Sequence, residues 1–461
     1  MTASFATDAG SAPLSLLKAL IRHAHAILKG HGDRERTQRD AITVFAVRCA
    51  SAALLYLSQI VLARWMGSYE YGIYVFVWTW VLVLGGLTDL GLGMANIRFI
   101  SHYREKNELP LLRGLIAGSR AATLAAGTLV AALGVAGIWL FEPLQSAYVL
   151  PIYLALVCVP LYALTDVQDG LAKGFAWMGL SLIPPFILRP ALLLIAMVVA
   201  NLAGFPMRAE TAAASAIVAT WAAGIVQTVL INRRLPSVAG AGPRTYAFRT
   251  WLTAAMPLLV IAACEITLQS ADVLIISHYL TPTHVAIYFA AAKTMSLMMF
   301  VHYAVGSAVA NRFAALGARG DAESLRAFVA DAVRWTFWPS LAAAVVLLLM
   351  GMPLLWLFGP QFVEGYPVML ILVVGFLFRS AMGPAEFLLN MLGQQTACAA
   401  VLVTTAILNI ALNLLLVPAF GLVGAAAATS ASLVTAALLN YIAVSWRLGL
   451  DIAIWRNVRK R

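Results

Sequence analysis

Long hydrophobic stretches recur along the chain from Ala41 to Trp446. A helix of about 20 apolar residues can cross a bilayer, because it satisfies all its backbone polar groups internally. Short alternating strands, which would indicate a membrane barrel, do not recur. The pattern therefore predicts an all-α integral membrane protein. The twelve predicted spans are 43–64, 73–97, 114–140, 148–168, 179–200, 211–231, 251–277, 284–310, 335–357, 366–389, 397–417 and 421–445.

The amino-acid composition agrees with this pattern. Of the 461 residues, 62% are hydrophobic and 11% are charged. Soluble domains have roughly 25% charged residues, so this chain has far more apolar surface than a water-soluble core can bury.

Basic residues gather on one side of the predicted membrane. The net charge of +11 would suit nucleic acid, but the distribution of the charge argues against such a partner. With a cytoplasmic N-terminus, the inner segments hold 23 of the 31 Lys and Arg residues, and the outer segments hold only Arg64 and Arg208. Cytoplasmic loops of membrane proteins carry such an excess of positive charge. Both termini are therefore predicted to lie in the cytoplasm.

Two parts of the chain resemble each other at a constant offset. The stretch “YEYGIYVFV” (69–77) matches “THVAIYFAA” (283–291), 214 residues later, and Arg98 matches Arg312 at the same offset. The repeat predicts two six-helix halves with the same orientation, related by an axis along the membrane normal. Such halves enclose a central cavity in transporters.

The repeat and the charges together predict five parts. They are a basic amphipathic cytoplasmic extension (1–40), a first six-helix bundle (41–232), a basic cytoplasmic linker (233–250), a second six-helix bundle (251–446) and a basic cytoplasmic tail (447–461). The extension carries charge throughout “LSLLKALIRHAHAILKG”, so it is predicted to lie on the inner leaflet and not to be a signal peptide. The alternative for this extension is an unstructured tail.

Ionisable side chains inside the predicted spans are the main candidates for function. Each costs roughly 3 kcal/mol and usually faces a cavity or a partner. The candidates are Arg48, Asp89, Arg189, Glu265, Asp272, Lys293, Arg379 and Glu386.

The first span of each half carries a polar stripe. Glu265, Gln269 and Asp272 share one helical face, at spacings of four and three residues. At the offset of 214, Ser51 matches Glu265 and Ser58 matches Asp272. The stripes are predicted to line the central cavity, and the alternative is that they hold neighbouring helices together. The polar part of the cavity, with candidates for ion coupling, is predicted to consist of Asp89, Glu265, Gln269, Asp272 and Glu386.

Asp89 and Arg98 lie near each other in the sequence but are not predicted to pair. In one continuous helix, their separation places them on opposite faces. Arg98 is interpreted as an anchor at the membrane edge, and Arg48 is the hypothesised partner of Asp89. Two other charged residues have two interpretations each. Arg189 either faces the cavity or forms hydrogen bonds with carbonyl groups freed by nearby prolines. Lys293 either faces the cavity or reaches the outer surface.

No motif indicates an enzyme. Neither a phosphate-binding GxxxxGK[ST] loop nor a GxSxG elbow is present. The four cysteines and seven histidines lack metal-ligand spacing, and His302 is interpreted as a bystander near a membrane edge. The sequence therefore predicts neither a metal nor a cofactor.

Three stretches resemble a known family: “QIVLARWMGSYEYGIYVF”, “DLGLGMANIRFIS” and “ILNIALNLLLVPAFGLVGAAAATSAS”. They are similar to the bacterial oligosaccharide flippases, the Wzx-type polysaccharide-unit exporters, from residue 41 to the end. The resemblance implies the fold of the multidrug/oligosaccharidyl-lipid/polysaccharide exporter superfamily. It also implies that undecaprenyl-pyrophosphate-linked oligosaccharides move from the inner to the outer leaflet of the bacterial inner membrane, for O-antigen, capsule or exopolysaccharide. A polysaccharide polymerase, glycosyltransferases and membrane lipids are the implied partners.

The candidate residues suit this substrate. Arginine binds phosphate oxygens with two parallel hydrogen bonds, so the pyrophosphate is predicted to contact Arg48, Arg189, Lys293 and Arg379. Hydroxyl and amide groups suit a glycan, and the predicted contacts are Ser51, Ser58, Gln59 and Asn409. An inside-negative potential of 100 mV favours outward movement of two negative charges by roughly 5 kcal/mol.

Three other functions are alternatives to this one. A drug/cation antiporter of the same superfamily would use the acids of the predicted cavity. A peptidoglycan-precursor flippase typically has two further C-terminal spans, whereas this sequence reaches “WRNVRKR” after the twelfth. A membrane polymerase or ligase usually carries a large periplasmic loop, which the span pattern lacks.

Overall fold

The computed structural model describes residues 33–141 and 146–457, with side chains from Val47 onward. Every regular element within these ranges is a helix, which confirms the predicted all-α class. The chain divides into two units, Met1–Leu54 and Leu55–Arg461, and each is considered by itself. Residues 1–32 of the predicted amphipathic extension lie outside the described residues.

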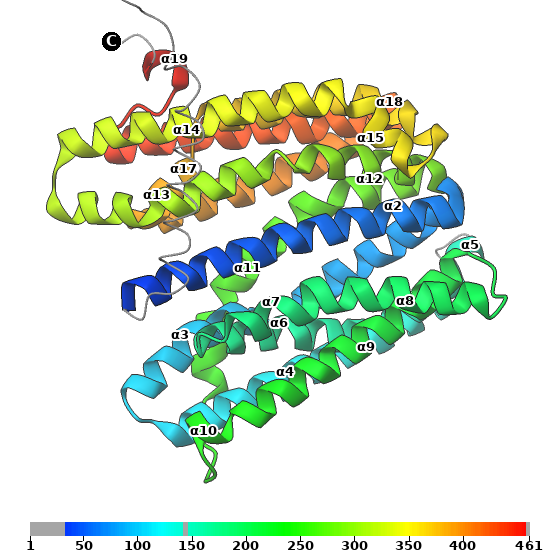
Figure 1. Ribbon diagram of the computed structural model, residues 1–461, viewed down its shortest axis with the longest axis horizontal. Helices are drawn as coiled ribbons and strands as arrows, with labels where there is room; N and C mark the ends of the chain where they lie inside the picture. The colour runs from blue at the N-terminus through cyan, green and yellow to red at the C-terminus, as the bar shows by residue number, and fades with distance from the viewer. Residues whose placement is uncertain (1–32, 142–145, 458–461) are drawn as a thin grey trace, which may run out of the picture. The chain divides into compact units, whose positions relative to one another are not determined.

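Two series of helices follow one another along the chain. The first half contains α2 (Asp33–Thr88), α3 (Leu92–Glu105), α4 (Leu109–Phe141), α5 (Ser146–Leu156), α6 (Val159–Gly174), α7 (Met178–Ile183), the π-helix η1 (Pro184–Leu188), α8 (Arg189–Leu202) and α9 (Ala209–Arg234). The short α10 (Pro236–Ala239) follows. The second half contains α11 (Phe248–Tyr279), α12 (Pro282–Ser296), α13 (Met299–Arg319), α14 (Ala322–Leu349), α15 (Gly351–Phe358), the 3-10 helix η2 (Pro360–Gly365), α16 (Tyr366–Ala381), α17 (Ala385–Met391), α18 (Gln395–Leu448) and α19 (Ile454–Asn457). Figure 1 shows α8 beside α9 in the first half and α13 beside α14 in the second.

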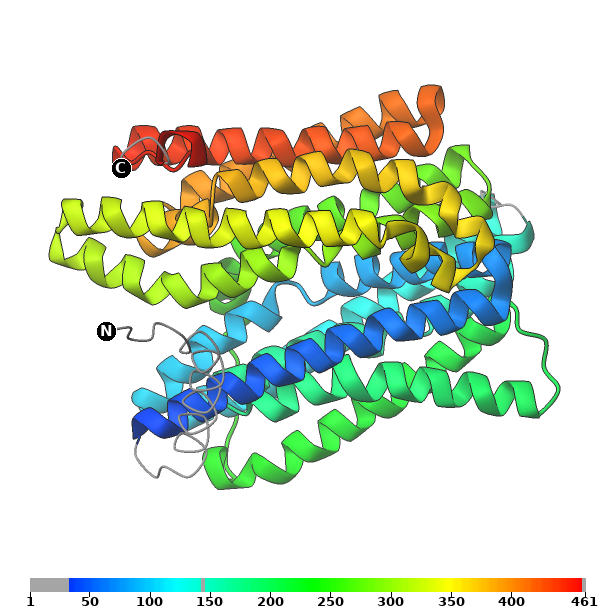
Figure 2. The same cartoon turned by 45° about the horizontal axis from the view of Figure 1, so that its top comes forward.

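Nine helical stretches in the described ranges are long and apolar enough to span a membrane, or ten if the bent pair α5–α6 forms one span. The longest two contain 59 and 54 residues, and each includes a glycine with non-helical dihedral angles, Gly67 (φ 76°) or Gly421 (φ 59°). Glycine adopts a positive φ without strain from a Cβ atom, so the chain can reverse there, as Figure 2 shows for α18. If each of these two stretches crosses the membrane twice and the pair α5–α6 forms one span, the total is compatible with the twelve predicted spans. The number twelve stays a prediction.

Several of the predicted spans contain a break in the helix. The span at 73–97 breaks between α2 and α3, where Leu90 and Gly91 have φ angles of 57° and 69°. The span at 179–200 contains the π-helix η1, whose prolines lack backbone N–H donors. The other broken spans are 148–168, 284–310, 335–357 and 366–389. Hydropathy records the length of an apolar stretch but not the backbone angles inside it.

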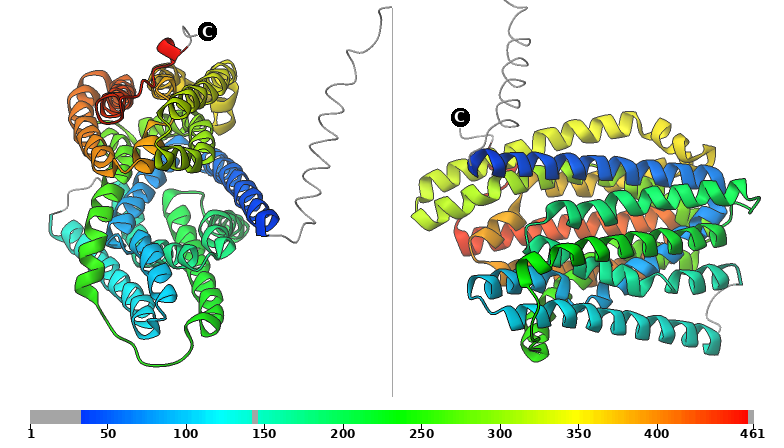
Figure 3. Two further views of the ribbon diagram at one scale, coloured as in Figure 1. Left: turned by 90° about the vertical axis from the view of Figure 1, so that its left-hand side faces the viewer. Right: turned by 60° about the horizontal axis from the view of Figure 1, so that its bottom comes forward.

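Three clusters of buried apolar side chains stabilise Leu55–Arg461. The largest combines residues of α2, including Leu62 and Tyr71, with residues of α12, α15, α16 and α18. A second cluster lies within the second half, and a third joins α3, α4 and α6 to Trp251 of α11. The two halves therefore share one core near Gly67 and Gly421; at their other ends the second half has a core of its own, and the start of α11 packs on the first half. The end view in Figure 3 shows the two series as two groups of helices.

Part of the predicted C-terminal tail is packed. Leu450, Ile452 and Ala453 are buried in the core of the second half. The ring of Trp455 lies 6.3 Å from that of Phe378, measured between centroids. Residues 458–461, the most basic part of the predicted tail, lie outside the described residues.

Candidate functional site

Arg189 stands directly after the π-helix, at the first position of α8. Its guanidinium carbon lies 4.9 Å from the ring centroid of Tyr162 and 5.7 Å from that of Trp78. A guanidinium that stacks on aromatic rings keeps its N–H edge for an acceptor. The structure thus holds this cation by ring contacts and leaves it able to bind an anion.

A cavity of about 40 Å³ lies beside Arg189. Ser58, Gln59, Tyr74, Trp78 and Thr220 contribute to its wall. Three predicted site residues, Ser58, Gln59 and Arg189, are therefore brought together by α2 and α8. A water molecule needs roughly 15 Å³ of such space and small-molecule pockets have roughly 300 Å³ or more. In this conformation the cavity holds small solvent species and is too small to enclose a sugar.

One carboxylate lies near this cation, and a second lies near the first. Asp166 of α6 interacts electrostatically with both Arg189 and Asp89. Asp89 accepts a hydrogen bond from the backbone N–H of Gly91 at 2.7 Å, at the break before α3. The hypothesised partner of Asp89, Arg48, lies in the other unit, so that pairing stays a prediction. Asp166 was not among the predicted site residues, although it is an acid just inside the end of the predicted span 148–168.

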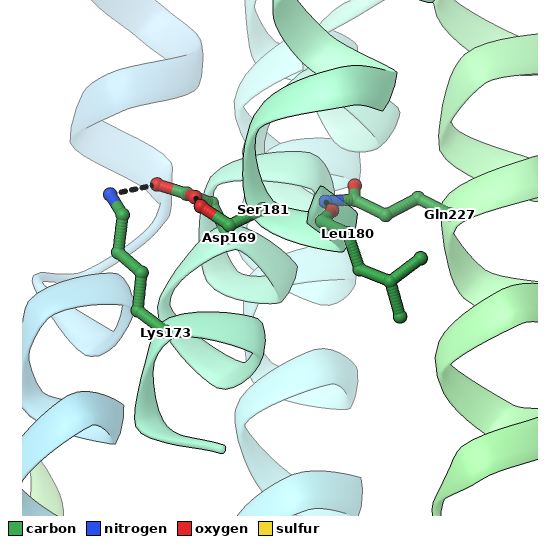
Figure 4. Close-up of polar contacts among 5 residues, drawn as sticks. All are labelled: Asp169, Lys173, Leu180, Ser181 and Gln227. Atoms are coloured by element: carbon green, nitrogen blue, oxygen red, sulfur yellow. Dashed lines mark hydrogen bonds and ion pairs between the residues drawn. The ribbon is translucent and has the colours of Figure 1, made fainter. Parts of the chain in front are cut away.

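A polar network fixes the turn between α6 and α7 (Figure 4). Lys173 forms an ion pair with Asp169, one helical turn away, and the hydroxyl of Ser181 also donates to Asp169. Nearby, Nε2 of Gln227 donates to the carbonyl oxygen of Leu180 at 3.0 Å. Because Asp169 already has two partners, Asp166 is the carboxylate of α6 that remains for Arg189.

Asp272 has the most complete set of hydrogen bonds in the second half. The hydroxyls of Tyr288 and Thr429 donate to Oδ2 at 2.5 and 2.7 Å, and Nδ2 of Asn413 donates to Oδ1 at 3.2 Å. The residue is 7% exposed. None of these partners carries a charge. The network therefore surrounds one buried carboxyl group that has no cationic partner among its hydrogen bonds.

The residues of the two predicted polar stripes differ in exposure and in their hydrogen-bond partners. Glu265 and Gln269 are exposed, whereas Asp272 points into its own half. In the first half, Ser51 donates to Val47 O at 2.6 Å and Ser58 donates to Leu55 O at 2.7 Å. Each serine hydroxyl thus bonds its own helix, and a shared cavity lined by all these residues stays a prediction.

Arg379 and Glu386 form an ion pair across the break between α16 and α17. Nη2 of Arg379 lies 2.7 Å from Oε1 and 2.9 Å from Oε2 of Glu386. Nε of the same arginine is buried without a hydrogen-bond partner. In this conformation a carboxylate of the protein occupies the place on Arg379 that the sequence assigns to phosphate.

The remaining predicted contacts are dispersed. Arg48 is exposed within its own unit. Lys293 is exposed, and its Nζ lies 5.4 Å from the ring centroid of Phe289. Asn409 is 1% exposed, so it cannot contact a glycan in this conformation. Arg189 and Arg379 belong to different halves, and the predicted cations do not form a single cluster among the described residues.

For His302, which was interpreted as a bystander near a membrane edge, the structure shows a buried position. The side chain is 2% exposed on α13, and neither ring nitrogen has a hydrogen-bond partner. It interacts electrostatically with Arg379 and Glu386. Its position well inside the predicted span 284–310 was the signal in the sequence that could have identified it.

Comparison with known proteins places the chain in a family. Residues 38–316, more than half of the chain, match the polysaccharide biosynthesis protein family. The chain belongs to this family. A curated relative from Haloferax volcanii, named “Probable low-salt glycan biosynthesis flippase Agl15”, is 25% identical over 170 residues, which are 37% of this chain and 36% of the relative. This member of the polysaccharide biosynthesis family thus matches about a third of that relative's length.

Solved structures resemble the whole fold. An inward-facing multidrug resistance MATE family transporter of the MOP superfamily has a TM-score of 0.74, with 13% identity over 86% of this chain and 94% of its own. The lipid II flippase MurJ, in an inward closed conformation, has a TM-score of 0.66, with 13% identity over 88% of this chain and 87% of its own. At such identities the likeness shows the fold alone, and it confirms the predicted superfamily fold. The relative is named as a flippase, and these two structures are those of a transporter and a flippase.

Proposed function

We propose that this polysaccharide biosynthesis protein moves undecaprenyl-pyrophosphate-linked oligosaccharide units from the inner to the outer leaflet of the bacterial inner membrane. The units would then enter a surface polysaccharide such as O-antigen, capsule or exopolysaccharide. The observation that carries the proposal is Arg189 at the wall of a cavity with Tyr74 and Trp78. An arginine suits the phosphate, and aromatic rings beside it suit the apolar faces of a sugar.

Alternating access is the proposed mechanism. The two halves share the large core near Gly67 and Gly421, whereas at the other end the second half has a core of its own and the start of α11 packs on the first half. Rocking of one half against the other can therefore close one side of a central site while it opens the opposite side. The charge pattern assigns the shared core to the outer side of the membrane.

A reconstituted system tests the function. Purified protein in liposomes is supplied with an undecaprenyl-pyrophosphate-linked oligosaccharide, and the glycan on the opposite leaflet is measured by its oxidation with impermeant periodate. We expect transport to depend on the protein and to increase with a membrane potential. Transport of lipid II but not of this glycan lipid would instead indicate a peptidoglycan-precursor flippase.

A drug/cation antiporter is the second candidate, and the acids inside the helices favour it. Asp89, Asp166 and Glu265 could bind a cationic compound. In the same liposomes, exchange of a cationic dye against protons, with no movement of the glycan lipid, would support this candidate and overturn the first.

Asp272 is the residue that we propose for ion coupling. A buried carboxylate without a cationic partner needs a proton or a monovalent cation for neutralisation. Asp272→Asn keeps the size of the side chain and removes the charge. We expect it to make transport insensitive to imposed proton or Na⁺ gradients, as measured in the liposome system. The matched control is Asp331→Asn, which changes a half-exposed acid on α14; an unchanged response to both gradients in the Asp272 variant would contradict the assignment.

A further inference from the structure

The ion pair between Arg379 and Glu386 is open at one edge. The side chains of Arg379 and Glu386 are 18% and 30% exposed. Tyr303 of α13, which interacts with Arg379, is 53% exposed. Glu265 of α11 is exposed and interacts electrostatically with both members of the pair. A ligand can therefore approach the pair from the side of Glu265 and Tyr303 without unfolding the second half.

Next to the pair, α13 packs against α17. The ring of His302 lies 6.4 Å from that of Phe387, the residue next to Glu386, measured between centroids. Gly306, one turn further along α13, leaves no room for a Cβ atom against Phe387, since an added Cβ would lie 2.4 Å from the phenyl ring. The helices α13 and α17 are thus in tight contact, and this contact holds His302 beside the pair.

Several polar atoms around the ion pair have no hydrogen-bond partner. Nε of Arg379 and both ring nitrogens of His302 are buried without a partner. Buried polar groups normally have partners, so three unpartnered nitrogens around one ion pair indicate a second arrangement in which they are used. Three further titratable groups act on the pair or on His302 from neighbouring helices: Glu265 of α11, Tyr303 of α13 and Cys398 of α18.

We propose that Glu386 is a displaceable counter-ion of Arg379, and that the diphosphate group of the substrate replaces it during transport. His302 then takes up a proton from a hydronium ion of the solution, which leaves water, becomes an imidazolium, and pairs with the displaced carboxylate of Glu386. The diphosphate accepts hydrogen bonds from Nη2 and Nε of Arg379. This inference rests on the proposed function, because it assigns the anionic group of that substrate to a particular arginine.

The charges of the two groups favour the replacement of Glu386 by the diphosphate at Arg379. A diphosphate has a greater negative charge than a carboxylate and suits the planar edge of a guanidinium. A carboxylate that simply lost Arg379 would be a partly buried charge without a partner, which is unfavourable. A protonated His302 removes this penalty, since both of its ring nitrogens then donate hydrogen bonds. His302 is therefore a positioning residue, and Arg379 is the residue that contacts the substrate.

A structural ion pair and a displaceable counter-ion predict opposite effects of Glu386→Gln. If the pair only holds α16 to α17, this change weakens both the fold and ligand binding. If Glu386 competes with the ligand, the change removes the competitor, so that an anionic lipid binds more tightly than it does to the wild type.

The test uses full-length protein in detergent and undecaprenyl pyrophosphate as the probe, with binding measured by calorimetry at pH 6 and pH 8. We expect Glu386→Gln to tighten binding at pH 8 by about tenfold, the range of a single favourable charge interaction. Wild-type affinity should fall from pH 6 to pH 8, because His302 must be protonated when the probe binds. This fall should be absent in His302→Gln and in Glu386→Gln.

Further variants separate the outcomes. Arg379→Ala should lose most of the binding, and Asp331→Asn should bind like the wild type. Equal or weaker binding by Glu386→Gln, or an unchanged pH dependence in His302→Gln, overturns the displacement. If Glu386→Gln does not fold, His302→Gln decides alone. Failure of the wild type to bind the probe at either pH contradicts the proposed function itself, whereas wild-type binding without a gain in the Glu386 variant contradicts only the present inference.

Discussion

Arg189→Ala is expected to reduce the transport of the lipid-linked glycan by roughly 10- to 100-fold. A hydrogen bond to a charged group contributes roughly 1.5–3 kcal/mol, and each 1.4 kcal/mol corresponds to about a tenfold change. Arg189 is the cation at the wall of the cavity, where Tyr162 and Trp78 hold its guanidinium. Without this side chain, the diphosphate loses its proposed partner in the first half, and transport in the liposome system measures the loss.

Two further variants distinguish binding from general damage. Arg189→Lys keeps the charge but loses the planar fork and its stacking on the rings, so we expect an intermediate rate. Arg208→Ala changes an exposed arginine at the start of α9 and should transport like the wild type. Wild-type transport by Arg189→Ala, at a normal level of folded protein, would remove Arg189 from the proposed site.

Gly72→Ala is expected to destabilise the shared core of the two halves. A Cβ atom at position 72 would lie 1.8 Å from the carbonyl oxygen of Pro282, the first residue of α12. Backbone atoms cannot move aside as a flexible side chain can, so α2 and α12 must separate. Overpacking of this kind costs about 1–3 kcal/mol or more. We expect a lower melting temperature, measured by thermal unfolding in detergent.

The same change should shift the conformational equilibrium of the two halves. Next to Gly72, Arg64 donates to the carbonyl oxygens of Leu357 and Trp356 at 2.7 and 2.6 Å, and Ser68 bonds Gln361. These contacts join α2 to the second half. Separation of α2 from α12 should therefore lower the yield of a disulfide between cysteines introduced at positions 68 and 361.

The matched control is Gly137→Ala. An added Cβ at Gly137 of α4 would meet no heavy atom within 4 Å, and the backbone there is helical. Alanine is favoured over glycine in helices by roughly 1 kcal/mol, so this variant should be as stable as the wild type or slightly more stable. An unchanged melting temperature and cross-linking yield in Gly72→Ala would show that the close approach of α2 and α12 is unimportant.

Much of the architecture could be predicted because the bilayer constrains it strongly. Uninterrupted apolar stretches can only be helices in lipid, so the all-α class followed from hydropathy. The constant offset between “YEYGIYVFV” and “THVAIYFAA” indicated the doubled design. Charges inside spans are costly, so their rarity alone selected Arg189, Asp272, Arg379 and Glu386 as candidates. These conclusions need no knowledge of which helix contacts which.

The partners of those charges were decided only by the tertiary structure. The carboxyl group of Asp272 accepts hydrogen bonds from Asn413 and Thr429, which lie 141 and 157 residues later in the sequence. His302 acquires its place beside Glu386 because α13 packs against α17. The reason is physical: hydropathy and spacing act along one helix, whereas the pairing of buried charges depends on backbone breaks and contacts between helices. The sequence by itself predicted an all-α membrane protein with an internal repeat and a few costly charges, and the packing of its broken helices decided which of those charges meet.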